Sequence, residues 1–134
     1  MNPVLRNILA VFVGLIVGSA VNGALIHMSP MLIAPPAGVD VTSAEGLQAG
    51  MHLFQPKHFL MPFLAHALGT FAGAFVAAKM AATRKLTFAM VIAFFFLFGG
   101  MASVFMLPSP LWYTLVDLLF AYIPMGYLAA RLAK

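Results

Sequence analysis

The chain has 134 residues, of which 63% are apolar and 7% charged, and its formal net charge at pH 7 is +4. An ordinary soluble domain carries about 25% charged residues, so seven basic and three acidic side chains cannot cover a water-soluble fold of this size. The composition excludes a soluble monomer and predicts an all-α membrane protein that forms a single transmembrane domain over residues 1–134. The absence of cysteine excludes disulfides and thiolate metal sites.

Four apolar segments are long enough to cross the hydrocarbon core, which takes about 20 residues of helix. They are expected at residues 8–28, 59–78, 86–107 and 111–130, and they predict a four-transmembrane-helix bundle. Six of the seven basic residues flank these spans on one side: Arg6, Lys79, Arg84, Lys85, Arg131 and Lys134. By the positive-inside rule both termini are cytoplasmic, and a prokaryotic plasma (inner) membrane is the expected location. Because the positive charge reports topology, we expect the lipid bilayer and no nucleic acid as a partner.

The connection at residues 29–57 is too long to be structureless in a compact protein. Thr42 and Glu45 have the spacing of a capping box. An apolar stripe (Ala44, Leu47, Met51, Phe54) then lies opposite a polar one (Glu45, Gln48, His52, Gln55). The pattern predicts a short amphipathic helix over about residues 43–55, at the outer lipid interface. Ser29-Pro30 is expected to end the first span.

Small residues predict where helices approach closely, because association in lipid depends on tight backbone packing. Gly14 and Gly18 form a GxxxG motif in the first span, and Gly69 and Gly73 form another in the second. Two interpretations remain open, one in which these faces pack the first two spans together and one in which they join copies of the chain. In the fourth span, Pro124 predicts a kink near Gly126.

Polar side chains inside the spans are the most informative residues, because a charge there costs on the order of 3 kcal/mol or more. At about 1.5 Å rise per residue, Asn22, His66 and Asp117 all lie roughly 9 to 10 Å below the outer ends of their spans. Other polar residues lie within about a turn of this depth. The sequence therefore predicts one polar intramembrane locus in the outer third of the bundle, made of Asn22, His66, Thr70, Ser103, Thr114 and Asp117.

Three interpretations of this locus are open. A His66–Asp117 hydrogen bond that only fixes helix register is the plainest, and a proton or cation pathway through Asp117 is the main functional one. A catalytic pair is the weakest, because no nucleophile motif accompanies it, so no enzyme and no catalytic residue is predicted. The function we expect is ion- or proton-linked transport or permeation by a small polytopic protein. The alternative is a non-catalytic accessory or scaffold subunit, and the partner is a second copy or another membrane protein.

Histidines and methionines gather near the outer face, and thioether ligands suit copper better than zinc. The histidines are His27, His52 and His58, and the methionines are Met28, Met31, Met51 and Met61. Interfacial positions and ordinary packing explain all of them. A haem would need His66 to meet His27, the one transmembrane partner available to it. We therefore predict no metal and no cofactor.

The aromatic residues follow the membrane pattern. Trp112 and Tyr113 lie at the outer end of the fourth span, where amphipathic rings favour the interface. The run Phe94-Phe95-Phe96 lies in an uncharged span and is expected to face lipid.

Overall fold

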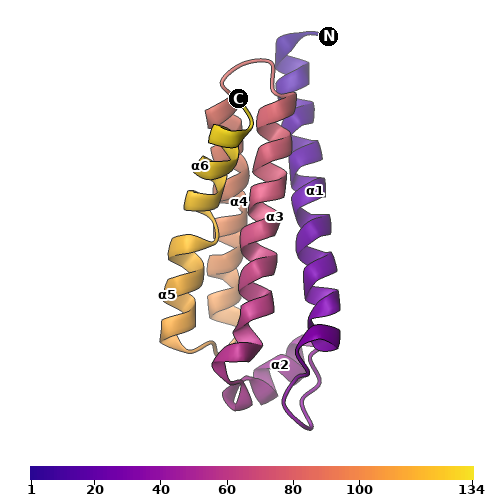
Figure 1. Cartoon of the computed structure of the whole chain (residues 1–134), viewed down its shortest axis with the longest axis vertical. Coiled ribbons are helices and arrows are strands. Elements are labelled where there is room, and N and C mark those ends of the chain that lie inside the picture. The colour runs from indigo at the N-terminus through magenta and orange to yellow at the C-terminus, as the bar shows by residue number, and fades with distance from the viewer.

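The computed structural model describes all residues 1–134 and contains helices but no strands (Figure 1). The long helices are α1 (Pro3–Leu32), α3 (Leu60–Met80), α4 (Lys85–Met106), α5 (Leu111–Phe120) and α6 (Ile123–Leu132). A short helix α2 (Ala44–Gly50) and two 3-10 turns, η1 (Met51–Leu53) and η2 (Pro56–Phe59), lie between α1 and α3. Four helical stretches are long and apolar enough to cross a membrane: Pro3–Leu32, Pro56–Met80, Lys85–Met106 and Leu111–Leu132. The predicted all-helical fold with four such stretches is confirmed, and the protein has the features of a multi-pass membrane protein.

The two ends of the bundle differ in charge and in structure. Both termini and the α3–α4 turn lie at one end, here the basic end, while α2 and the α4–α5 turn lie at the other, here the loop end (Figure 1). At the basic end, the Asn7 side chain donates to Thr83 Oγ1 at 3.0 Å and accepts from the Ala82 N–H at 2.8 Å. The Arg6 side chain donates to the Met80 carbonyl at 2.6 Å. These bonds tie the α3–α4 turn to the start of α1.

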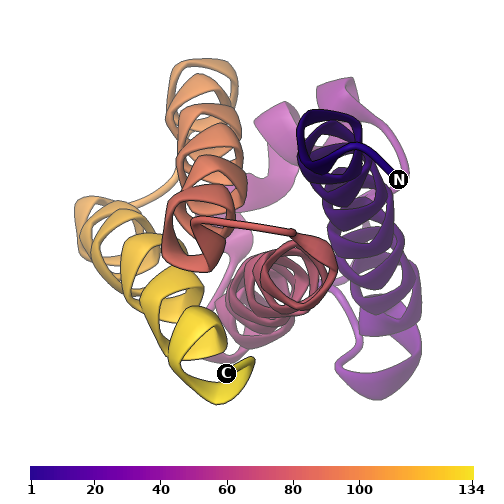
Figure 2. The same cartoon turned by 90° about the horizontal axis from the view of Figure 1, so that it is seen from above.

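Helices α1 and α3 pack through their glycines. A Cβ atom added to Gly14 would lie 2.7 Å from the Gly73 carbonyl oxygen, and one added to Gly18 would lie 2.8 Å from that of Gly69. Only glycine allows backbones this close, because any side chain would have to overlap the opposite carbonyl. The two GxxxG faces therefore meet within one chain. In the view from above, α3 lies between α1 on one side and α4 and α6 on the other (Figure 2).

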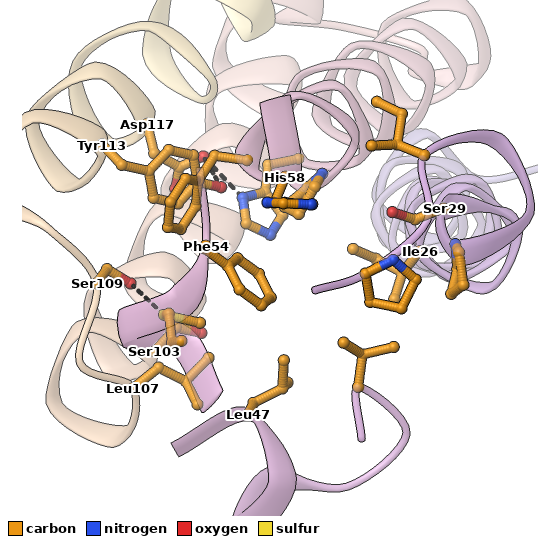
Figure 3. Close-up of a pocket in the computed structure, with 18 of the residues that line it drawn as sticks. Ile26, Ser29, Leu47, Phe54, His58, Ser103, Leu107, Ser109, Tyr113 and Asp117 are labelled. Atoms are coloured by element: carbon orange, nitrogen blue, oxygen red, sulfur yellow. Dashed lines mark hydrogen bonds and ion pairs between the residues drawn. The ribbon is translucent and has the colours of Figure 1, made fainter. Parts of the chain in front are cut away.

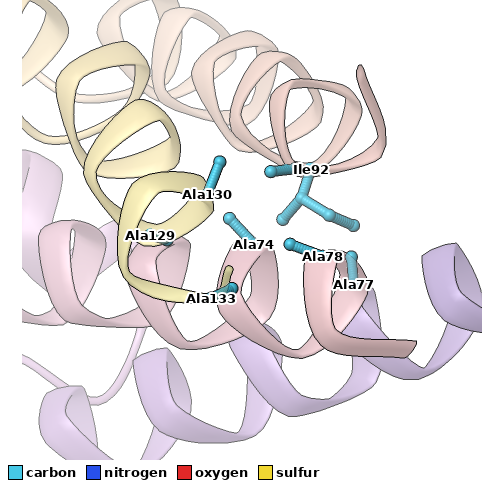
Figure 4. Close-up of a cluster of buried hydrophobic side chains, with 8 residues drawn as sticks. Ala74, Ala77, Ala78, Ile92, Ala129, Ala130 and Ala133 are labelled. Atoms are coloured by element: carbon cyan, nitrogen blue, oxygen red, sulfur yellow. The ribbon is translucent and has the colours of Figure 1, made fainter. Parts of the chain in front are cut away.

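The half of the bundle toward the basic end has a core of small side chains. Eight buried residues from α3, α4, α6 and the end of the chain form it (Figure 4): Ala74, Ala77, Ala78, Ala89, Ile92, Ala129, Ala130 and Ala133. Seven of the eight are alanines, so the helices approach closely there. Phe96 packs against this cluster, whereas Phe94 and Phe95 are 48% and 57% exposed. The expectation that all three phenylalanines face lipid is thus wrong for Phe96, whose ring lies against Gly18.

Several helix boundaries differ from the sequence-based predictions; the helix expected over about residues 43–55, for example, ends at Gly50 and is followed by the 3-10 turn η1. Helix α1 continues through Pro30 to Leu32 instead of ending at Ser29-Pro30. A proline removes only one hydrogen bond, and the next turn keeps its own, with the Ile33 N–H donating to the Ser29 carbonyl at 2.9 Å. The cap of α2 is Ser43 and not Thr42, because Ser43 Oγ accepts from the Gly46 N–H at 3.0 Å.

The fourth span is interrupted at Ala121 and Tyr122, between α5 and α6. The sequence predicts a kink near Gly126, and the structure places the break before Pro124 instead. The physical reason is that a proline affects the turn that precedes it, where its ring meets the backbone and its missing N–H leaves a carbonyl free. Gly126 has another role, because a Cβ added there would lie 2.6 Å from the Cβ of Ala93. It therefore allows α6 to pack closely on α4.

Candidate functional site

Two adjoining chambers occupy the loop-end half of the bundle. The larger has a volume of about 460 Å³ and lies between α1, the α1–α3 connection, α3, α4 and α5. The smaller, of about 230 Å³, lies deeper, between α1, α3 and α4. His66, Gly100 and Ser103 line both chambers, so the two share a boundary. Figure 3 shows the larger chamber, with Tyr113 and Asp117 on the wall opposite Ile26.

The carboxylate of Asp117 lines the larger chamber next to this boundary, and the residue as a whole is 5% exposed. His66 Nδ1 lies 2.7 Å from Asp117 Oδ1. The Tyr122 hydroxyl donates to Oδ2 at 3.0 Å, and the Tyr113 hydroxyl donates to Oδ1 at 3.5 Å. With Asp117 ionised, its carboxylate only accepts hydrogen bonds, and His66 Nδ1 then carries the proton of the first bond. Three donors from α3, α5 and the α5–α6 break thus hold one carboxylate.

The imidazole of His66 is held by two contacts. Its Nδ1 is fixed by Asp117, and its ring stacks on Tyr122 with centroids 5.9 Å apart and planes at 24°. His66 also lines both chambers. Its orientation follows from helix packing, because α3 carries the histidine while the break in the fourth span supplies the tyrosine.

The smaller chamber holds polar atoms that have no partner within the protein. Asn22 Oδ1 and Thr70 Oγ1 are both buried and unpaired, and Thr70 as a whole is 1% exposed. A buried polar group without a hydrogen bond costs about 1 to 3 kcal/mol. Ser103 differs, because its hydroxyl donates to the Gly99 carbonyl of its own helix at 3.2 Å. Asn22 and Thr70 therefore offer hydrogen-bonding capacity to whatever enters this chamber.

The structure places all six residues of the predicted locus around the two chambers. His66 and Asp117 are in direct contact. Asn22, Thr70 and Ser103 line the smaller chamber with His66, and Thr114 lines the larger one with Asp117. The locus is therefore one hydrogen-bonded pair with polar walls beside it, and not a single network that joins all six side chains.

Sequence reasoning missed two members of the site, Tyr113 and Tyr122. Tyr113 was expected at the membrane interface with Trp112, but Tyr113 is 7% exposed while Trp112 is 47% exposed. The sequence contains a signal that Tyr113 belongs to the site. Residues four apart share a helix face, and Asp117 follows Tyr113 by four residues. Tyr122 follows Asp117 by five residues, a spacing that brings the two side chains together only because the helix breaks between them.

The α1–α3 connection covers the loop end of the larger chamber. Gln48 on α2 donates to the Met106 carbonyl at the end of α4 at 2.8 Å. His58 Nδ1 accepts from the Gln55 N–H at 2.8 Å, so His58 Nε2 carries the proton and donates to the Ala34 carbonyl at 3.1 Å. The apolar stripe of the connection packs inward, with Leu47 and Phe54 against a cluster of Met51, Phe59 and Tyr113.

The histidines weighed as metal ligands do not form a ligand set. His27 and His58 both line the larger chamber, but His52 does not. The chain contains no group of three or more His, Asp or Glu side chains placed to hold a metal ion. Both ring nitrogens of His58 are already used in bonds to the connection.

The chemistry available at the site is that of proton exchange and cation binding. A carboxylate, an imidazole and two phenols surround one point, and no Lys or Arg lines either chamber. With His66 neutral, this cluster carries a formal charge of −1 inside the bundle. The hydroxyl of Ser103 donates to a backbone carbonyl and not to a base. No protein-family model, no curated protein and no solved structure matches the chain.

Proposed function

We propose that this protein carries protons or small cations across a prokaryotic inner membrane, with Asp117 as the group that binds the ion and His66 as its partner. In the proposed orientation both termini lie in the cytoplasm, because six basic residues and no acidic residue lie at that end. The amphipathic α2–η1 segment then lies at the outer interface, and the larger chamber lies beneath it in the outer half of the bundle.

A single observation carries the proposal. A buried carboxylate lines the larger chamber, is bonded to a histidine that lines both chambers, and lies beside an interruption in the helix that bears it. A charge inside a membrane is costly and marks ion pathways. Interrupted helices are the usual site of ion coordination in membrane carriers, because the break frees backbone groups and lets side chains converge. In this protein the break lets the Tyr122 side chain reach the carboxylate of Asp117.

The closed half of the bundle favours a carrier over an open pore. The chambers lie at the loop end, whereas the alanine cluster packs α3, α4 and α6 closely toward the basic end. An ion at Asp117 would leave on the cytoplasmic side only after these helices move. The α5–α6 break is the natural hinge, because Ala121 and Tyr122 lie between the two helices and belong to neither.

Ion flux in proteoliposomes tests this proposal. With a potassium diffusion potential as the driving force and a trapped pH dye as the readout, the wild-type protein should acidify the lumen faster than empty liposomes. Sodium and potassium uptake are measured in parallel. Asp117→Asn keeps the size of the side chain but removes its charge, and it should lower the flux at least tenfold. Glu45→Gln is the matched control, because it makes the same change at an exposed carboxylate on α2.

Two results would contradict the proposal. If Asp117→Asn folds and retains wild-type flux, Asp117 is not part of the pathway. If the wild-type protein conducts none of the three cations above the empty-liposome rate, transport is refuted, and the accessory-subunit alternative takes its place. Thermal unfolding of each variant in detergent shows whether a loss of flux reflects a loss of fold.

A further inference from the structure

We propose that the two chambers form a binding site for a lipophilic organic cation, with the charged group beside Asp117 and the apolar body in the larger chamber. The inference rests on the proposed role of Asp117 in cation binding and names the class of substrate that the site would take. It draws on the size of the larger chamber, the composition of its walls, the charge at its inner end and the exposure of the two helices that border it.

The larger chamber has the size and walls of a small-molecule site. Its volume of about 460 Å³ falls within the range of roughly 300 to 1,000 Å³ typical of ligand pockets. A proton or an inorganic ion needs no such space. Much of the wall is aliphatic or aromatic: Ile26, Ile33, Leu47, Phe54, Phe59 and Leu107. An apolar body fits these walls better than a hydrated ion, because it leaves few polar groups unpaired.

The polar end of the site selects a positive charge. The titratable groups that face Asp117 are His66 from α3, Tyr113 from α5 and Tyr122 from the break. His27 and His58 are the other titratable groups on the chamber walls, and no Lys or Arg is present. With the histidines neutral, the site therefore has one uncompensated negative charge. In a medium of low dielectric constant such a charge attracts a cation far more strongly than in water.

Aromatic rings and free acceptors strengthen the same preference. Tyr113 and Phe59 line the larger chamber, and Tyr122 and Phe96 line the smaller one. Aromatic faces attract cations within about 6 Å of the ring centre. Asn22 Oδ1 is a buried acceptor without a donor. It is therefore available to an N–H group of a protonated amine that reaches the smaller chamber.

The larger chamber is lined by both α1 and α4 on a side where residues of the two helices are exposed. Ile26 on α1 and Val104 on α4 line the chamber, and these residues are 41% and 38% exposed. All residues from Met101 to Met106 are exposed, so no neighbouring helix encloses this part of α4. A ligand that has partitioned into the outer leaflet can therefore enter between α1 and α4 without crossing the α1–α3 connection. Lateral entry suits lipophilic cations, because they concentrate in the membrane.

Binding of tetraphenylphosphonium to the purified full-length protein in detergent tests the inference. This probe has a permanent positive charge and an apolar surface. Equilibrium dialysis should show saturable binding of one cation per chain. Triphenylphosphine oxide, a neutral analogue with three of the four aryl groups, should bind at least tenfold more weakly. Asp117→Asn should weaken binding of the cation at least tenfold, and Glu45→Gln should leave it unchanged.

A second variant keeps the test decisive if Asp117→Asn fails to fold. Val104→Trp narrows the larger chamber from its α4 wall, and the partial exposure of Val104 leaves room for the fold to tolerate the change. It should weaken tetraphenylphosphonium binding at least tenfold, and thermal unfolding in detergent shows whether the variant keeps its fold. Unchanged binding by Val104→Trp would place the ligand outside the chamber and overturn the inference.

The two proposals can fail separately. If the wild-type protein binds the cation no better than the neutral analogue, the substrate class is refuted, even where Asp117-dependent proton flux is present. If cation binding depends on Asp117 but no ion flux occurs, transport is refuted while the binding site stands. Non-saturable uptake of both probes would show partition into detergent only, and it would overturn the inference as well.

Discussion

Replacement of Gly14 by alanine should separate α1 from α3. The new Cβ would lie 2.7 Å from the Gly73 carbonyl oxygen, 3.1 Å from the Cβ of Ala77 and 3.2 Å from the Cδ1 of Ile92. Carbon–oxygen contacts between packed helices lie at about 3.3 to 3.6 Å, so the helices must move apart by roughly 0.6 Å or more. The backbone carbonyl cannot turn aside, and overpacking of this kind costs about 1 to 3 kcal/mol.

Alanine also favours the helical conformation over glycine by about 1 kcal/mol, which offsets part of this loss. Gly23→Ala in the same helix isolates the packing effect, because a Cβ at Gly23 meets nothing within 4 Å. The helix-forming gain is common to both variants. The free energy of unfolding of Gly14→Ala should therefore lie about 1 to 3 kcal/mol below that of Gly23→Ala.

Unfolding by sodium dodecyl sulfate in mixed micelles, followed by far-ultraviolet circular dichroism, measures this difference. Native mass spectrometry of both variants shows whether the number of copies in the assembly changes. If Gly14→Ala is as stable as Gly23→Ala, the tight α1–α3 contact does not exist. If Gly14→Ala loses only its association with other copies, this glycine face joins chains instead of packing two helices of one chain.

Two other predictions concern hydrogen bonds to carboxylates, those to Asp117 inside the fourth span and those to Asp40 in the α1–α3 connection. Tyr122→Phe should lower the free energy of unfolding by about 1 kcal/mol, because the Tyr122 hydroxyl lies 3.0 Å from the Asp117 carboxylate. Tyr113→Phe should lower it by clearly less, because the Tyr113 hydroxyl lies 3.5 Å from the same carboxylate. Equal losses of stability in the two variants would contradict this geometry. Outside the spans, hydrogen bonds from the Thr42 side chain and N–H lower the pKa of Asp40 below its ordinary value of 3.8. The contribution of Asp40 to stability should thus be fully present above pH 3.8 and disappear as the pH falls through the lowered pKa. The Thr42 amide resonance followed by NMR should titrate below pH 3.8 and should lose this titration in Asp40→Asn.

Properties that depend on neighbours along the chain could be predicted from the sequence. The four apolar stretches follow from length and composition alone, because a helix satisfies its own backbone and needs only an apolar surface to cross a membrane. The charge difference between the two ends follows in the same way, since the flanking residues are adjacent in sequence to the spans. The depth of Asn22, His66 and Asp117 could be worked out as well, because the rise per residue of a helix is constant.

Properties that depend on how the helices turn and pack were decided by the tertiary structure. The contact between His66 and Asp117 requires a particular rotation of two helices, and depth says nothing about rotation. Tyr113 faces inward while Trp112 faces outward, although the same interfacial rule applied to both. Tyr122 reaches the carboxylate because the break before Pro124 changes the course of the chain.

The sequence by itself thus determined the class of protein, the four helices and the set of polar residues at one level. The tertiary structure alone decided that the glycine faces meet within one chain, that three donors converge on one carboxylate and that two chambers lie beside it. The physical reason is that helix formation and apolar length are local properties, whereas helix order and rotation depend on side-chain packing between distant segments. A close approach of two backbones, such as that at Gly14 and Gly73, appears only when both helices are in place.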